Sequence, residues 1–148
     1  MSRSLLLTVV DEPQASAVAE YVAGAHGDGA VDVTLLHVVP YTEKRTSPSR
    51  GGRDRPDGWF DRAQKEAEAL FEMVTEQLGD TAATVETAIE SGDPSEEIVS
   101  YAADHDVDGI VLGFRKRSPT GKLVFGSTAQ DVLLSTTCPV VAVPLADS

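Results

Sequence analysis

Apolar runs and mixed stretches alternate along the chain. Four runs rich in β-branched residues have the length of buried strands, at residues 5–10, 32–39, 108–114 and 139–143. A weaker run at 83–90 alternates apolar and polar positions, which is typical of an edge or half-exposed strand. The pattern therefore predicts five strands.

The intervening segments carry apolar residues at helical spacing. Residues 13–23 place Ala15, Val18 and either Tyr21 or Val22 on one face. Residues 59–78 give the clearest helix, with apolar residues mostly three or four positions apart. We expect these two helices to lie between successive strands.

Two further helices have recognisable starts. Asp93 is expected to be an N-cap, Pro94 suits the first helical position, and Glu96 would complete a capping box. The last helix is expected to begin near Ser127, with its apolar residues turned inward: Ala129, Val132 and Leu133.

Strands that alternate with helices, and that are apolar along their length, indicate a parallel sheet covered on both faces. The sequence therefore predicts one doubly wound α/β domain over residues 1–148, since no internal repeat or second domain is visible. Residues 40–58 interrupt the pattern with Pro, Gly, Ser and charged residues, and are predicted to form a long flexible loop.

Charge is unevenly distributed. The chain has 24 acidic and 12 basic residues, a formal net charge of −12, yet five cations lie in 40–58 and four in 115–122. Either these are solvated loops, or both lie near one anionic ligand. The acidic surface disfavours nucleic acid binding, and with few lysines it also resembles surfaces adapted to high salt.

Several kinds of chemistry have no support in the sequence. The single cysteine, Cys138, excludes an internal disulfide and a multi-cysteine metal site. The three histidines show no metal-ligand spacing, and His37 is interpreted as a hydrogen-bonded core residue. No nucleophile–base pair suggests a hydrolase. No apolar run approaches the roughly 20 residues of a membrane span, and the start does not resemble a signal peptide, so we expect a cytoplasmic protein.

The candidate site lies where ligands bind in open parallel sheets, beyond the carboxyl ends of the strands. Asp11 follows the first strand and could accept hydrogen bonds from a ribose or a base, or could cap the next helix. Residues 37–40 follow the second strand. The third such segment, 113–128, follows the fourth strand, reads GFRKRSPTGKLVFGST and has the composition of a phosphate-binding loop. The alternative for it is a turn-rich loop before a well-capped helix.

The glycines, hydroxyls and cations of 113–128 have separate expected roles. Gly113 would let the chain leave its strand without a side chain that blocks a ligand, while Gly121 and Gly126 allow turns. Ser127 and Thr128 would add donors at a helix N-terminus. The formal positive charge comes from Arg115, Lys116, Arg117 and Lys122.

Four segments span nearly the whole chain in a recognisable order and spacing: VVDEP, LLHVV, SGDPSEEIVSYAADHDVDGIVLGFR and GSTAQDVLLSTTCPVVAVP. In these segments the chain resembles the universal stress protein family. The resemblance implies a five-stranded parallel sheet of order 3-2-1-4-5, with helices on both faces, a Rossmann-like or adenine nucleotide alpha hydrolase-like fold. It also implies a homodimer formed through strand 139–143, which suits an apolar edge strand.

The resemblance further implies an ATP site of the UspA-like kind, with Mg²⁺ as a possible companion. ATP-binding members carry G-x2-G-x9-G-[ST]; Gly113, Gly126 and Ser127 match it, whereas Lys116 replaces the second glycine. Asp11 matches the aspartate that contacts the nucleoside, and Val38 the strand-end residue whose backbone meets the adenine. The resemblance implies a regulatory ATP-binding stress protein; the alternative is a dimeric adaptor that binds a protein partner through its basic loops.

Overall fold

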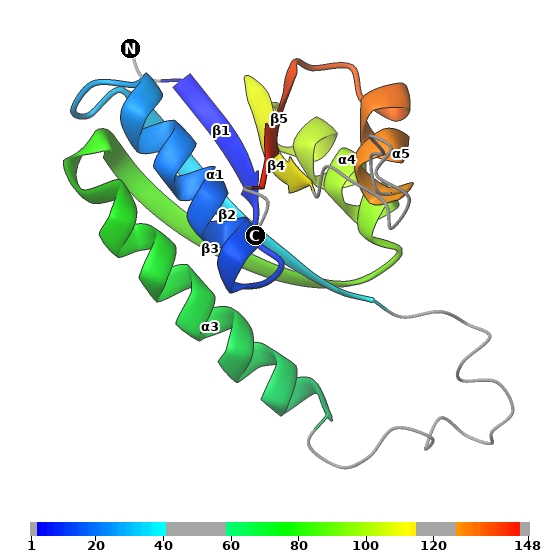
Figure 1. Ribbon diagram of the computed structural model, residues 1–148. Helices are drawn as coiled ribbons and strands as arrows, with labels where there is room; N and C mark the ends of the chain where they lie inside the picture. Colours follow the sequence, from blue (N-terminus) through cyan, green and yellow to red (C-terminus); the bar gives the residue numbers. More distant parts are fainter. Residues whose placement is uncertain (1–2, 41–58, 115–126, 146–148) are drawn as a thin grey trace, which may run out of the picture.

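The computed structural model describes residues 3–40, 59–114 and 127–145. Five parallel strands form one sheet in the order β3-β2-β1-β4-β5 (Figure 1). The strands are β1 (Arg3–Thr8), β2 (Val31–Pro40), β3 (Ala82–Gly92), β4 (Gly109–Phe114) and β5 (Val140–Pro144). The helices are α1 (Glu12–Ala25), α3 (Trp59–Leu78), the short 3-10 helix η1 (Gly79–Thr81), α4 (Pro94–Asp104) and α5 (Ser127–Ser135). The predicted α/β class and strand order are confirmed.

Two apolar cores lie on opposite faces of the sheet. Leu5 and Leu7 of β1 point toward α1 and α3 and pack with Val18 and Phe71. Leu6, between them, points the other way and packs against α4 and α5. Successive side chains of a strand alternate between faces, so an uninterrupted apolar run in β1 supplies both cores. This explains why the buried strands read as continuous apolar runs.

The first strand ends two residues earlier than the sequence predicts. Ladder pairing of β1 with β2 stops at Thr8–Leu36, although the apolar run continues through Val9 and Val10. Val10 is 59% exposed. The apolar pattern was misleading here because the backbone N–H of Val10 bonds to the Gln14 side chain at 2.8 Å instead of extending the ladder.

Two expectations about the helices also need correction. Asp93 is the N-cap of α4 and Pro94 follows it, but the Asp93 carboxylate makes no cap bond to the helix backbone. It accepts a hydrogen bond from the Ser95 hydroxyl at 3.4 Å instead, so the predicted capping box is not formed. In α5, Ala129 and Val132 are buried as expected, whereas Leu133 is 38% exposed. Ala129 and Val132 are three positions apart and share one face of the helix, whereas Leu133 lies about 100° around the helix from Val132.

Candidate functional site

A cavity of about 540 Å³ opens at the carboxyl edge of the sheet. It lies between β1 and β4, where strand order reverses: the chain goes from β1 to β2 on one side and reaches β4 and β5 on the other. This is the place where open α/β sheets bind ligands, and the volume is within the roughly 300–1,000 Å³ of small-molecule pockets. Its inner walls are apolar: Leu36, Ile98, Leu112 and Ala129.

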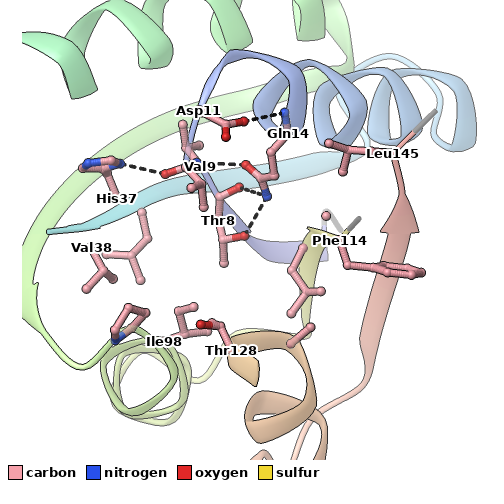
Figure 2. A pocket seen from close by; sticks show the side chains of 16 residues that line it. Thr8, Val9, Asp11, Gln14, His37, Val38, Ile98, Phe114, Thr128 and Leu145 are labelled. Atoms are coloured by element: carbon pink, nitrogen blue, oxygen red, sulfur yellow. Dashed lines mark hydrogen bonds between the residues drawn. The ribbon is translucent and has the colours of Figure 1, made fainter. Parts of the chain in front are cut away.

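The turn from β1 into α1 forms one rim of the cavity and is held by the Gln14 side chain (Figure 2). The Gln14 carboxamide oxygen accepts from the Val10 N–H at 2.8 Å. Its nitrogen donates to the Thr8 carbonyl oxygen at 3.1 Å and to the Thr8 hydroxyl at 3.2 Å. Gln14 is only 5% exposed. The turn is therefore fixed by three bonds to one buried side chain.

Gly113 lines the cavity as predicted. The structure also shows why a side chain would not fit at this position. A Cβ at this position would lie 3.0 Å from Cγ and 3.2 Å from Nε2 of Gln14, and 3.3 Å from Cδ1 of Leu145. The space is thus used by protein atoms. In addition to the predicted role of leaving room for a ligand, which stays a prediction, Gly113 leaves room for Gln14.

Asp11 also lies on the rim and is the N-cap of α1. Its Oδ1 accepts a hydrogen bond from the Gln14 N–H at 3.0 Å. Of the two roles left open by the sequence, the capping role is therefore present in the structure. The carboxylate remains at the mouth of the cavity and is largely exposed.

On the β2 side, Val38 and His37 complete the rim. The backbone groups of Leu36 face β1, where its carbonyl accepts from the Val9 N–H at 2.9 Å. Strand alternation turns the N–H and C=O of Val38 the same way, beyond the point where the β1–β2 ladder ends. His37 Nδ1 lies 2.8 Å from the Val9 carbonyl oxygen; since a carbonyl only accepts, Nδ1 carries the proton.

His37 was expected to be a core histidine. The hydrogen bond is confirmed, but the ring is half-buried and lines the cavity. His37 lies just beyond the point where the pairing of β1 with β2 ends, while its pairing with β3 continues. The predicted core position is therefore wrong, and its place at the rim is a feature of the tertiary structure.

The opposite wall comes from the helices of the second face. Thr128, in the first turn of α5, lines the cavity next to Ile98 of α4 (Figure 2). Ser127 is the first residue of α5. The other predicted site residues lie outside the described part of the chain: Arg115, Lys116, Arg117, Gly121, Lys122 and Gly126. Asp11, Val38, Gly113 and Thr128 therefore meet at one cavity, as predicted.

Sequence reasoning missed Thr8 and Gln14. Gln14 does carry a signal, because it precedes Val18 by four positions and so falls on the buried face of its helix. A polar residue on that face needs a buried partner. Thr8, inside an otherwise apolar run, is a similar signal.

In the described residues no group of three or more His, Cys, Asp or Glu side chains could hold a metal ion, and no helix there is long and apolar enough to cross a membrane.

Comparison with known proteins points in one direction. The model of the universal stress protein family matches residues 1–144. Stress response protein NhaX of Bacillus subtilis is 31% identical over 136 residues, 92% of this chain and 71% of that protein. Universal stress protein MJ0577 of Methanocaldococcus jannaschii is 30% identical over 125 residues, 77% of each chain.

Solved structures of universal stress proteins have the same fold as this chain. The structure of MJ0577 superposes with a TM-score of 0.78 at 25% identity, covering 100% of this chain and 99% of the other. The universal stress protein of Archaeoglobus fulgidus in complex with dAMP gives a TM-score of 0.63 at 22% identity, covering 97% and 98%. With the family model matching nearly the whole chain and this strand order, the chain belongs to the universal stress protein family.

Proposed function

We propose that this chain is a cytoplasmic regulatory protein of the stress response that binds ATP in the cavity at the carboxyl edge of its sheet. The observation that carries the proposal is the cavity itself: an apolar interior of about 540 Å³ at the switch point between β1 and β4. The family relative from Archaeoglobus fulgidus in complex with dAMP supports an adenine nucleotide as the ligand.

The purine would lie inside the cavity, and backbone groups of β2 would recognise its edge. Its faces would pack against Ile98 and Leu36, which are buried apolar residues of the cavity wall. Its edge would meet the N–H and C=O of Val38, which face away from β3 beyond the end of the β1–β2 ladder. One donor and one acceptor side by side match the polar edge of adenine. Val38 thus supplies recognition through its backbone.

The ribose and phosphates would lie toward the mouth. Asp11 can accept from a ribose hydroxyl there, in addition to capping α1. The phosphates would approach the N-terminus of α5, where unpaired N–H groups favour anions. Ser127 and Thr128 begin this helix.

The segment before α5 would supply the positive charge that a chain of net charge −12 needs to hold a polyphosphate. Gly121 and Gly126 would allow the loop to turn around the phosphates. Four cations would face them as charge partners: Arg115, Lys116, Arg117 and Lys122. At the position of the motif glycine, Lys116 would act as a point charge on a phosphate instead of allowing close backbone approach.

Titration calorimetry with Mg-ATP tests the proposal. We expect saturable binding of one ATP per chain, weaker binding of AMP because fewer phosphates meet the cations, and weaker binding of GTP because its edge reverses the donor–acceptor order at Val38. Affinity for ATP should fall with added salt while that for adenosine changes little. If no heat of binding is measured up to millimolar ATP, the proposal is contradicted. That result would favour the alternative, a dimeric adaptor that binds a protein partner through the basic segments 40–58 and 115–122.

We also propose that the protein is a homodimer formed through β5. This strand lies at the edge of the sheet, pairs with β4 alone, and carries the half-buried Val140, Val141 and Val143. An apolar edge strand readily pairs with another chain. Sedimentation equilibrium should give twice the chain mass of 15.7 kDa, and a Val141→Lys substitution, which places charge on the edge, should shift the equilibrium to monomer. A wild-type monomer at tens of micromolar would contradict this.

A further inference from the structure

Thr8 lies on the floor of the cavity among apolar side chains. It pairs with Leu36 in the neighbouring strand, and continuing the β1–β4 register by one residue brings Leu112 to its other side. All three residues line the cavity. The Thr8 side chain is only 4% exposed. Figure 2 shows it pointing toward the cavity, across from Ile98 and Thr128. A hydroxyl group is thus buried where an isosteric valine would complete the apolar row.

The neighbouring carboxamide determines how this hydroxyl is used. Gln14 can be oriented in one way only, because the Val10 N–H can only donate to it and the Thr8 carbonyl can only accept from it. Its nitrogen therefore faces Thr8 and donates to the hydroxyl oxygen at 3.2 Å. The Thr8 hydroxyl is an acceptor in this bond, and its own proton is directed elsewhere.

Among the residues that the structure describes, the Thr8 hydroxyl makes one hydrogen bond, which it accepts from Gln14. No acceptor for its own proton is found among those residues. A buried O–H without an acceptor is costly, and buried polar groups in folded proteins nearly always have partners. Since Thr8 lines the cavity, a bound molecule is the natural source of the acceptor.

We propose that Thr8, held in place by Gln14, donates a hydrogen bond to a ring nitrogen of the base bound in the cavity, and so makes the cavity selective for heteroaromatic rings with an acceptor nitrogen at their buried edge. The inference rests on the proposed function. Apolar walls at Leu36, Ile98 and Leu112 accept the faces of a planar ring. A phosphate at this depth would lose its hydration without a lysine or arginine partner among the described residues that line the cavity. A neutral ring nitrogen needs only the one donor.

Binding of adenosine and its 1-deaza, 3-deaza and 7-deaza analogues to the full chain tests this first without any substitution. Each analogue replaces one ring nitrogen by C–H and leaves the other contacts in place. 1-Deazaadenosine should lose the contact proposed for the Val38 N–H, and we expect in addition that either 3-deaza- or 7-deazaadenosine binds about tenfold more weakly than adenosine, the size of effect of an unsatisfied buried donor. The inference is overturned if the 3-deaza and 7-deaza analogues both bind as adenosine does.

Thr8→Val and Thr8→Ser then assign that loss to the hydroxyl. We expect Thr8→Val to bind adenosine about tenfold more weakly and Thr8→Ser within about threefold of wild type. Whichever of the 3-deaza and 7-deaza analogues lost affinity for wild type should bind Thr8→Val and wild type alike, an outcome that a merely structural role for Thr8 would not produce. Equal losses for adenosine and all three analogues in Thr8→Val would overturn the inference.

The outcomes also separate this inference from the proposed function. If wild type binds no adenosine or ATP at millimolar concentration, both fail. If wild type binds ATP but Thr8→Val keeps full affinity for adenosine, the proposed function stands and the role of Thr8 is refuted. If Thr8→Val does not fold, which its melting curve shows, the analogue series on wild type and Thr8→Ser decides alone.

Discussion

Replacing Gln14 by leucine is expected to lower the free energy of unfolding by about 3 kcal/mol, because each buried polar group left without a partner costs about 1–3 kcal/mol. The substitution keeps the side chain's approximate volume and removes its three hydrogen bonds. The Val10 N–H loses its acceptor, and the Thr8 carbonyl and hydroxyl lose their donor. Urea unfolding followed by circular dichroism measures the change.

Gln64→Leu is the matched control for Gln14→Leu. Gln64 also stands in a helix, but it is only partly buried and its side chain donates to Glu68 at 3.2 Å on the surface of α3. Surface pairs of this kind contribute about 0.2–0.5 kcal/mol, so we expect little change. If Gln14→Leu were as stable as Gln64→Leu, the hydrogen bonds of the β1–α1 turn would not stabilise the fold as the structure indicates.

Gly113→Ala is expected to lower the free energy of unfolding by about 1–3 kcal/mol, the usual range for overpacking. The new methyl group would lie 3.0 Å from Gln14 Cγ and 3.3 Å from Leu145 Cδ1, so both neighbours must move. Movement of Gln14 weakens the bonds that position Val10 and Thr8. We therefore expect the substitution to reduce nucleotide affinity as well, which calorimetry on the variant measures.

The same strand offers a control for this substitution. At Gly109, in β4, an added Cβ would lie 3.5 Å from Leu5 Cδ2 and 3.5 Å from the Pro139 carbonyl oxygen, which is ordinary contact. Replacing glycine by alanine without strain stabilises by about 0.4–1 kcal/mol through the unfolded state, so Gly109→Ala should be neutral or slightly stabilising.

A double variant tests the stated cause of the Gly113→Ala effect. In a Gln14→Ala background the clashing atoms are gone, and the further cost of Gly113→Ala should fall by about 1 kcal/mol or more, as expected for residues in direct contact. Additive costs in the two backgrounds would contradict the assignment of Gly113 as the residue that admits Gln14, and would leave its backbone or Leu145 as the cause.

Apolar periodicity was sufficient to predict the architecture. Each buried strand of this sheet supplies both cores, so the runs around Leu6 and Ile110 read as continuous apolar segments. The weaker run around Val85 was correctly predicted as an edge strand, because β3 lies at the end of the sheet. These features depend on which side chains of a single strand or helix are buried, and the spacing of apolar residues along that element shows this directly.

Local sequence was misleading where polar side chains compete for the same backbone or side-chain partners. Val9 and Val10 look like strand residues, yet the Gln14 side chain takes the Val10 N–H and His37 takes the Val9 carbonyl. Asp93 looks like a capping residue, yet its carboxylate pairs with the Ser95 hydroxyl. Each outcome depends on competing partners whose distance and direction are known only in the folded chain.

For the candidate site, the sequence by itself determined the edge of the sheet and four residues that meet there: Asp11, Val38, Gly113 and Thr128. It could do so because strand ends of a parallel sheet lie together by topology. Only the tertiary structure decided what fills the space between them. Gly113 is a glycine because Gln14 packs over it, and the bond from Gln14 commits the oxygen of the Thr8 hydroxyl and turns its proton elsewhere. The contact of Gly113 depends on packing between β4 and the turn after β1, two segments about a hundred residues apart in the chain. The bond to Thr8 depends on the direction that the buried Gln14 side chain takes within that turn.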